Sequence, residues 1–467
     1  MSTSDPLFGF EPEDVRRFDH EYVWHPFTPM DDYVAASPPV IVGGEGRRLQ
    51  DTEGRWYWDG SSSIWLNVHG HRDPDLDASI REQLDRIAHS TLLGAGNVPA
   101  SVLAKRLVDV TPEGLERVFF SDSGATAVEI ALKAAIQFFA NQGRAEKRHV
   151  VGFTDNYHGD TIGAMSVAPD PVFHWPFLSM LPEQPRVAYP YWFGHPSGAT
   201  NPEECRRATL DELTALLERD GERIAAVIIE PVEGAGGIRP APEGFLRDLR
   251  SLCDRHDVLM IVDEVATGFG KTGRMFACDA EGVTPDLMCL GKGLTGGYLP
   301  VAATLATGRV YDAFLGERRR ALYHGHSFTG NQLGCAVALA SLEKMPAVMD
   351  ALPPKIDRVW SRLAALRDLP CVGDVRGRGL MVGVELVADR DDPRPLPSDW
   401  RAGYAVTDHA RDLGLIVRPI GNVVIFMPPP SSTLEELDAM LDALVRAFED
   451  VTPRIAERVE RESRGRA

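Results

Sequence analysis

The sequence predicts an α/β protein with a mainly parallel sheet between helices, accompanied by a smaller α+β domain made from the N- and C-terminal segments. Short apolar runs alternate with helical segments along residues 73–345, which is typical of βαβ units. Several of these runs are apolar at every position, as strands buried on both faces of a parallel sheet are. We therefore divide the chain into residues 1–72, 73–345 and 346–467.

The first region is rich in aromatic residues. Its segments 21–30 and 55–71 combine aromatic side chains with turn-forming residues, which predicts short strands and turns. In the middle region each predicted strand ends near a polar or glycine-rich turn; the strands are RVFF, HVVGF, AAVIIE, VLMIVDE, DLMCLG and VAATLAT. We expect a ligand at one edge of this sheet, because open α/β sheets bind ligands at the carboxyl ends of their strands.

The last region holds two strand-like runs, 379–387 and 414–429, followed by a helix. We expect this helix to begin at a capping box formed by Ser432 and Glu435. Its apolar face is expected to lie in the core, and it consists of Leu437, Leu441, Leu444 and Phe448.

The composition is that of an ordinary globular protein. The chain has 467 residues, enough for two or three subdomains, and a net charge of −19, which argues against a nucleic-acid partner. No apolar run approaches the roughly 18 residues of a membrane span, and the N-terminus has no apolar leader, so we expect a soluble, cytoplasmic protein without a membrane partner. The six cysteines show no CxxC spacing, so we expect neither disulfides nor a cysteine metal site.

Two of the predicted strands end in residues with complementary chemistry. Asp263 ends the run Val258–Val262, and Lys292 follows the run Leu287–Leu290 between two glycines. The carboxyl ends of parallel strands share one edge of a sheet, so the carboxylate and the amine are expected to meet in one crevice. Pyridoxal phosphate needs such a pair: a lysine amine forms its Schiff base, and a carboxylate keeps its pyridine nitrogen protonated.

A phosphate site is predicted where a strand turns into an amphipathic helix, in FFSDSGATAVEIALKAAIQFF. The helix is expected to start near Gly124, and Ser123 and Ala125 leave room beside its free N–H groups. Many βα turns use the same residues, so the prediction gains its weight from Asp263 and Lys292.

Two further turns contribute candidate residues. In NYHGDT, Tyr157 is suited to cover one face of a planar cofactor, although a surface turn stabilised by Asp160 explains the motif equally well. In HGHSFTGNQLG, Ser327 is a hydroxyl donor for phosphate. The repeated HGH, at 69–71 and 324–326, raises the possibility of a metal site, but neither pair has an evident third ligand, so we predict packing or hydrogen-bonding roles and no metal.

Two nucleotide-binding motifs have partial matches in the sequence, and we reject both as binding sites. GFGKTG, residues 268–273, matches the spacing of a dinucleotide fingerprint, but Gly282 and Pro285 follow too soon for the required helix. A P-loop needs a glycine five residues before the G of GK[ST], and the residue there is Val265.

With these residues in view, the chain resembles the class III, fold type I aminotransferases over nearly its whole length. The shared segments are WHPF, SSIWLNVHGH, FFSDSGATAVEIALK, YHGDT, DEVATGFGKTG, GKGLTGGYLP, HGHSFTGNQLGCA and RPIGN. The resemblance implies pyridoxal 5′-phosphate as the cofactor and a homodimer with active sites at the subunit boundary.

The resemblance also implies individual roles. Lys292 would be the Schiff-base lysine and Asp263 the partner of the pyridine nitrogen, with Val265 and Tyr157 against the ring. Phosphate would be bound by the backbone of Gly124 and Ala125 and by Ser327 of the other subunit. The substrate region would comprise Trp65, Phe27, Ile64, Gly325 and Arg418, the last as the partner of a substrate carboxylate.

Within the family, WHPF and SSIWLNVHGH are most similar to members that convert 8-amino-7-oxononanoate to 7,8-diaminononanoate in biotin biosynthesis, with S-adenosylmethionine or L-lysine as amino donor. Many of these have tyrosine at Phe27, tryptophan at Ile64, proline at His326 and a tyrosine near Ile425. Losing one aromatic face at Ile64 favours a slimmer donor such as lysine. The alternatives are another class III activity, such as an ω-amino acid:pyruvate transaminase or an aminomutase, and a catalytically silent dimer that binds pyridoxal phosphate.

Overall fold

The computed structural model describes residues 5–171, 173–390 and 392–465. Its largest sheet has seven strands in the order β4-β12-β11-β10-β7-β5-β6. Their bounds are Leu115–Ser121, Ala302–Thr307, Leu287–Leu290, Leu259–Asp263, Ile224–Ile229, His149–Phe153 and Arg186–Val187, in that order. The five strands from β11 to β6 pair in parallel, and β12 runs antiparallel to both of its neighbours. The predicted α/β class with a mainly parallel sheet is therefore confirmed, and β6 is a strand that the sequence pattern did not reveal.

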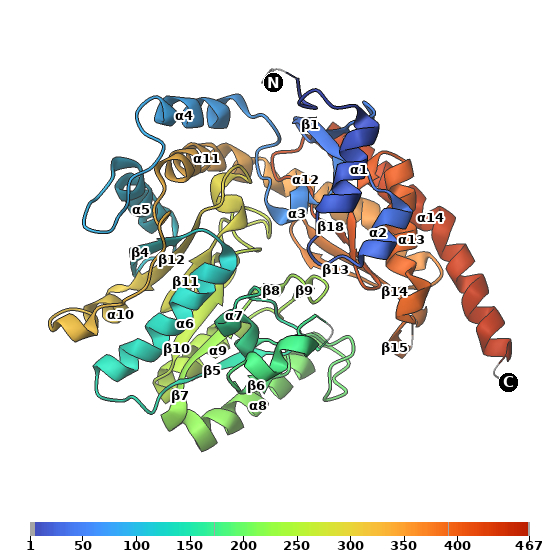
Figure 1. The fold of residues 1–467 in the computed structure, drawn as a ribbon. Helices are drawn as coiled ribbons and strands as arrows, with labels where there is room; N and C mark the ends of the chain where they lie inside the picture. Colours follow the sequence, from blue (N-terminus) through green and yellow to red (C-terminus); the bar gives the residue numbers. More distant parts are fainter. Residues whose placement is uncertain (1–4, 172, 391, 466–467) are drawn as a thin grey trace.

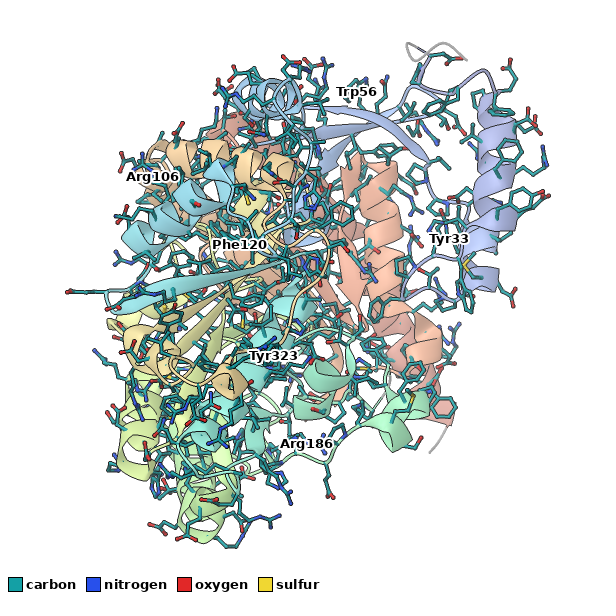
Figure 2. All side chains as sticks on the ribbon, turned by 60° about the vertical axis from the view of Figure 1, so that its left-hand side comes forward. Tyr33, Trp56, Arg106, Phe120, Arg186 and Tyr323 are labelled. Atoms are coloured by element: carbon teal, nitrogen blue, oxygen red, sulfur yellow. The ribbon has the colours of Figure 1, made fainter. Side chains whose placement is uncertain are left out.

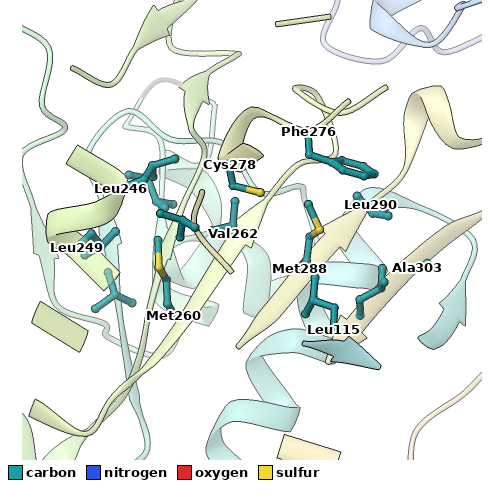
Figure 3. Close-up of a cluster of buried hydrophobic side chains, with 14 of the residues drawn as sticks. Leu115, Leu246, Leu249, Met260, Val262, Phe276, Cys278, Met288, Leu290 and Ala303 are labelled. Carbon is teal, nitrogen blue, oxygen red and sulfur yellow. The ribbon is translucent and has the colours of Figure 1, made fainter. Parts of the chain in front are cut away.

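Side chains alternate between the two faces of the sheet along each strand, and both faces are buried. On one face, Ile228, Ile261 and Cys289 pack against helix α6 (Gly124–Asn141). On the other face, Met260 and Val262 lie toward helix α9 (Phe245–His256), and Met288, Leu290 and Ala303 belong to the same buried cluster on the side of Leu115 and Phe276, as Figure 3 shows. This burial on both faces is why the strands are apolar at every position.

The other helices around the large sheet are α4, α5, α7, α8, α10 and α11 (Figure 1). Their bounds are Pro74–Leu84, Val98–Val110, Ile162–Val167, Pro202–Asp220, Gly308–Asp312 and Gln332–Asp350. A short hairpin of β8 (Val232–Glu233) and β9 (Arg239–Pro240) follows β7.

The N- and C-terminal segments lie together on the other side of the molecule (Figure 1). Strand β3 pairs in parallel with β16, and so joins residues far apart in the sequence. The sheet β1-β2-β3-β16 has the bounds Ile41–Glu45, Arg48–Asp51, Trp56–Asp59 and Leu415–Ile416. The sheet β13-β14-β18-β17, with β15 beside β14, has the bounds Val372–Arg378, Met381–Asp389, Val423–Phe426, Arg418–Ile420 and Asp392–Pro395. Figure 2 shows Trp56 and Tyr33 on this side, opposite Arg106 and Phe120 of the large-sheet side.

The remaining helices are α1 (Pro12–Tyr22), α2 (Met30–Ala36), α3 (Ser62–Trp65), α12 (Leu352–Leu363), α13 (Ala402–Asp412) and α14 (Leu434–Gly465). The prediction of strands at residues 21–30 was wrong: α1 ends there, α2 begins there, and no strand lies between them. Aromatic residues favour strands, but here Tyr22 and Trp24 are exposed, and Phe27 packs edge-on against Tyr157 and Phe173. The three-part division of the chain stays a prediction.

The capping box of α14 was predicted one residue too early. Thr433, and not Ser432, accepts a hydrogen bond from the Glu436 backbone N–H (3.1 Å), and the Glu436 carboxylate accepts one from the Thr433 N–H (2.8 Å). The apolar face was predicted correctly, since Leu437, Leu441, Leu444 and Phe448 are all buried. None of the helices in the described ranges combines the length and apolar composition needed to cross a membrane.

Candidate active site

A cavity of about 620 Å³ opens at the carboxyl ends of the sheet strands, between them and the N- and C-terminal segments. Every predicted site residue except Gly325 and Ser327 lines it; these residues are Phe27, Ile64, Trp65, Gly124, Ala125, Tyr157, Asp263, Val265, Lys292 and Arg418. The structure thus brings together side chains from segments more than 350 residues apart.

Asp263 ends β10 and is buried at the floor of the cavity. Its Oδ1 accepts a hydrogen bond from the Val265 N–H (3.0 Å), and its Oδ2 lies 2.7 Å from Nδ1 of His158. His158 is also buried, and its Nε2 has no hydrogen-bond partner among the described residues. The motif NYHGDT pointed to Tyr157 and gave no signal for the adjacent histidine, whose hydrogen bond orients the carboxylate.

Lys292 begins a short 3-10 helix, Lys292–Thr295, and has a φ of 39°. Burial lowers the pKa of its amine, while the negative charges of Asp263 and Glu230 act in the opposite direction. Its Nζ lies 5.1 Å from the centre of the Trp65 ring, within the range of a cation–π contact. The amine is therefore held between an aromatic face and carboxylates.

Glu230 is a second acidic residue of the cavity and was not among the predicted site residues. It follows β7, the strand beside β10, so the acid at the end of AAVIIE was the available signal. Its carboxylate accepts hydrogen bonds from the N–H groups of Tyr157 (2.8 Å) and Gly234 (3.2 Å). Burial, reinforced by the charge of Asp263, raises the pKa of Glu230 well above its ordinary value.

The N-terminus of α6 supplies backbone N–H groups to the cavity. Ser123 is its N-cap: the Ser123 hydroxyl accepts a hydrogen bond from the Thr126 N–H (3.3 Å), and the Thr126 hydroxyl accepts one from the Ser123 N–H (3.0 Å). Gly124 is required by packing, because a Cβ at this position would come within 2.6 Å of Val265 Cγ1. A helix start held in this way suits an anion, since its first N–H groups are free and its dipole is positive there.

Tyr157 satisfies both interpretations of its motif. Its hydroxyl donates to Asp160 Oδ2 (2.7 Å), as in a stabilised turn, and its side chain also lines the cavity. Burial raises its pKa, so the hydroxyl stays protonated. Phe27 packs edge-on against Tyr157 and Phe173, with ring centres 6.4 and 5.6 Å away.

The outer part of the cavity carries one cation. Arg418 lies on β17 opposite Ile425, is solvent-exposed, and makes no ion pair within 4.0 Å in the part of the chain that the structure describes. Arg378, an arginine of strand β13 in the same sheet, does not line the cavity, and its guanidinium donates to the Ala241 carbonyl (2.8 Å).

Gly325 and Ser327 lie outside the cavity of their own chain, and both are exposed. The Ser327 carbonyl accepts a hydrogen bond from His89 (2.8 Å). The histidines of the first HGH make hydrogen bonds: His69 pairs with the Ser341 hydroxyl (2.9 Å) and His71 with Asp59 (3.0 Å). Within the described ranges, no three His, Cys, Asp or Glu side chains are arranged to hold a metal ion.

GFGKTG forms turns and is followed by a short 3-10 helix, Ala277–Glu281, so it opens no helix that packs on the sheet. This agrees with its rejection as a dinucleotide site. The cavity instead offers the donor set of pyridoxal phosphate: an amine, an oriented carboxylate, an aromatic wall and a helix N-terminus.

Comparison with known proteins identifies the family. The family model of class III aminotransferases matches residues 33–448. An adenosylmethionine-8-amino-7-oxononanoate aminotransferase of Geobacter sulfurreducens is 47% identical, over 95% of this chain and 99% of its own. The crystal structure of the enzyme of the same name from Methanocaldococcus jannaschii is 43% identical, with a TM-score of 0.89 over 94% of this chain and all of that one.

A more distant structure is an amine transaminase from an uncultivated Pseudomonas species, in its form with bound pyridoxal phosphate. It is 33% identical, with a TM-score of 0.87 over 92% of this chain and 99% of that one. The cavity, its donor set and these matches lead to one conclusion: the chain belongs to the class III aminotransferases, a family of transaminases that depend on pyridoxal phosphate.

Proposed function

We propose that this transaminase converts 8-amino-7-oxononanoate to 7,8-diaminononanoate, a step of biotin biosynthesis. The observation that carries the proposal is the near-complete match to enzymes named for that substrate, at 43–47% identity, against 33% for the amine transaminase. The cavity suits a long-chain keto acid, because most of its wall is apolar and a free guanidinium, that of Arg418, stands at its outer part.

We assign the cofactor-facing roles to Lys292 and Asp263. When bound, pyridoxal phosphate supplies an electron sink for the bond-breaking step at the substrate carbon. Lys292 would hold the cofactor through its amine and then move a proton at the substrate carbon, for which the lowered pKa of the amine favours the neutral form. Asp263, oriented by His158 and the Val265 N–H, would keep the pyridine nitrogen protonated.

The other assignments follow from position and charge. The N–H groups of Gly124 and Ala125 would bind the phosphate, with Tyr157 and Val265 against the ring. Arg418 would pair with the substrate carboxylate.

Two compounds are candidates for the amino donor, and a different observation supports each of them. The names of the similar enzymes indicate S-adenosylmethionine. Ile64 favours L-lysine, because its aliphatic side chain lies in the cavity wall next to Trp65. It offers no aromatic face to the sulfonium of S-adenosylmethionine.

We also propose a cytoplasmic homodimer without nucleic-acid or membrane partners. Two hydrogen-bonded segments, 88–98 and 323–332, expose large apolar side chains, including Leu93, Val98, Tyr323 and Phe328. A second copy would cover this face and receive Ser327 at its phosphate site. The net charge of −19 disfavours binding to a phosphate backbone.

The test is turnover of 8-amino-7-oxononanoate with each donor by the purified protein. We expect 7,8-diaminononanoate to form, Lys292→Ala to abolish its formation, and the exposed-site control Lys105→Ala to retain it. Amination of pyruvate by an ω-amino acid, without turnover of the oxononanoate, would establish the other class III activity. Binding of pyridoxal phosphate without any turnover would identify a silent dimer.

A further inference from the structure

One wall of the cavity is built from a left-handed helical turn. Ser62, Ser63, Ile64 and Trp65 have φ values of 48°, 49°, 66° and 68°. The turn is hydrogen-bonded, since the Trp65 N–H donates to the Ser61 carbonyl (2.8 Å) and the Leu66 N–H to the Ser62 carbonyl (2.9 Å). Residues with a Cβ adopt this conformation singly and rarely, and a β-branched residue such as Ile64 is a clear outlier there. Strain of this kind persists only where the surroundings impose it.

The turn presents two side chains to the cavity. Ile64 is 42% exposed and Trp65 is buried with its ring beside the Lys292 amine. The ring fits because Gly234 has no side chain: a Cβ there would lie 3.0 Å from the ring edge. A right-handed or extended backbone would point both side chains elsewhere.

Three polar groups from different elements hold this turn. Asp59 accepts hydrogen bonds from the Ser63 N–H (2.8 Å) and hydroxyl (2.7 Å). The Ser62 hydroxyl donates to the Met427 carbonyl (2.6 Å). At the last residue, the Lys271 amine donates to the Trp65 carbonyl.

Lys271 is an unusual anchor. Its side chain is completely buried, and in the described part of the chain the Trp65 carbonyl is the one polar group within hydrogen-bonding distance of its amine. Burial, together with the nearby Lys292, lowers its pKa well below the ordinary value of a lysine. Buried lysines are rare unless they are paired, so this one needs a reason beyond packing.

We propose that Lys271 is a positioning residue: its amine, through the Trp65 carbonyl, holds the left-handed turn 62–65 so that Ile64 and Trp65 form the substrate wall beside Lys292. Lys271 itself stays out of contact with the substrate. The statement about the turn stands on the geometry alone, and the statement about substrate rests on the function proposed above.

A matched pair of buried lysines separates positioning from packing. Lys147 is also buried, and its amine donates to the carbonyls of Ile224 (2.9 Å) and Asp257 (2.8 Å), away from the cavity. Lys271→Met and Lys147→Met each remove an amine and keep an unbranched side chain. Lys271→Arg keeps N–H donors for the Trp65 carbonyl.

The first measurement is amide hydrogen exchange of a peptide covering residues 60–68, in the protein with and without pyridoxal phosphate. We expect Lys271→Met to lose protection there, Lys271→Arg to regain at least part of it, and Lys147→Met to keep the parent's protection. Equal protection in parent and Lys271→Met would show that Lys271 is only a core residue, and the proposal would be wrong.

The second measurement is steady-state kinetics with the oxononanoate. Loss of a hydrogen bond of ordinary strength predicts a KM about three- to tenfold higher for Lys271→Met. The absorbance of the bound cofactor should be unchanged, and Lys147→Met should keep the parent's KM. If Lys271→Met loses hydrogen-exchange protection at residues 60–68 but keeps the parent's KM, the assignment of the turn 62–65 to the substrate wall is wrong.

A second variant covers the case in which Lys271→Met does not fold. Ser62→Ala removes the hydroxyl that binds the Met427 carbonyl and leaves Lys271 in place. It should lower the same protection and raise the same KM, whereas parental values for both would refute the anchored turn. If the parent fails to turn over the oxononanoate, the proposed function fails, while hydrogen exchange still decides the role of Lys271.

Discussion

Three buried acids near the ends of neighbouring strands differ because their partners differ. Asp263 has a histidine and a backbone N–H, and Glu230 has two backbone N–H groups. Glu233 has no hydrogen bond to either carboxylate oxygen within the described chain, and Arg239 lies 3.6 Å away. Burial raises the pKa of Glu233 to about 8. Hydrogen bonds thus orient the carboxyl groups of Asp263 and Glu230, whereas Glu233 lacks them and its raised pKa favours the protonated form.

Glu233 predicts a pH-dependent stability. Its pKa is 4.5 ordinarily and about 8 in the folded protein, so both states are protonated below pH 4.5. Between these values the unfolded chain releases the proton that the folded chain retains, and stability falls as the pH rises. Glu233→Gln removes this loss. The free energy of unfolding of the variant, relative to that of the parent, should therefore be about 2 to 4 kcal/mol higher at pH 8 than at pH 4.5.

Thermal unfolding of the cofactor-free protein across this pH range measures the difference. The exposed-site control Glu82→Gln should follow the parent. If the midpoints of parent and Glu233→Gln differ by the same amount at every pH, Glu233 is ionised in the folded protein and the prediction is wrong.

Arg418 is the residue through which the acceptor carboxylate can be tested. Arg418→Ala should raise the KM for the oxononanoate, because a charged hydrogen bond worth about 1.5 to 3 kcal/mol is lost. That corresponds to roughly a ten- to hundredfold change. The absorbance of the bound cofactor should stay the same.

Arg378→Ala is the matched control for this arginine. Its guanidinium is already engaged by the Ala241 carbonyl, so the KM should not change. A larger effect at Arg378 than at Arg418 would transfer the carboxylate site to the former.

At the scale of the element, two neighbouring hydroxyl groups lie at the N-terminus of α14, and we expect their removal to have different effects on stability. Thr433 caps the helix, whereas the buried Ser432 hydroxyl has no hydrogen-bond partner among the described residues. Thr433→Ala should cost about 1 kcal/mol of stability, since a first-turn N–H loses its acceptor. Ser432→Ala should cost nothing, because it removes an unsatisfied polar atom. Chemical denaturation of both variants measures this, and a larger loss at Ser432 would restore the box that the sequence suggested.

The elements that sequence predicts well are those whose signal is local. β10 and β11 have continuous apolar runs, α6 has an amphipathic pattern, and their ends carry Asp263, Lys292 and Gly124 into the cavity. Helix α1 was missed because its aromatic residues favour strands as much as helices. The cap of α14 was shifted because Ser432 and Thr433 are equally good N-caps, and only the observed backbone separates them.

The left-handed turn 62–65 has no sequence signal, because Ser, Ile and Trp all disfavour that conformation. Its hydrogen bonds go to Asp59 just before it and to Met427 and Lys271 in distant segments, which local sequence does not reveal. His158 and Glu230 were missed for a different reason. His158 lies in the predicted turn NYHGDT and Glu230 ends the predicted strand AAVIIE, but their approach to Asp263 and Tyr157 depends on how these segments pack together.

At the scale of the whole molecule, segments 88–98 and 323–332 leave an apolar face uncovered. Leu93 and Val98 are 85% and 76% exposed, and the adjoining Phe328 packs against His89 at 4.9 Å between ring centres. Exposed apolar side chains that gather on neighbouring segments mark interaction sites. Ser327 belongs to the same face, which links the proposed dimer to the proposed phosphate site.

The last prediction tests this face by charge. Leu93→Glu together with Val98→Glu should give a folded monomer, because an acidic residue is favourable at the first position of α5 while two buried apolar contacts are lost. Each contact contributes about 1.5 to 3 kcal/mol, so the dissociation constant should rise by at least a hundredfold. Sedimentation at several concentrations measures it, with Leu413→Glu, an exposed site after α13, as the control that stays dimeric.

The monomer should also bind pyridoxal phosphate more weakly, since it lacks Ser327 from a second copy. A double variant that remains a dimer would move the interface to another face, and a monomeric parent would refute the shared active site altogether.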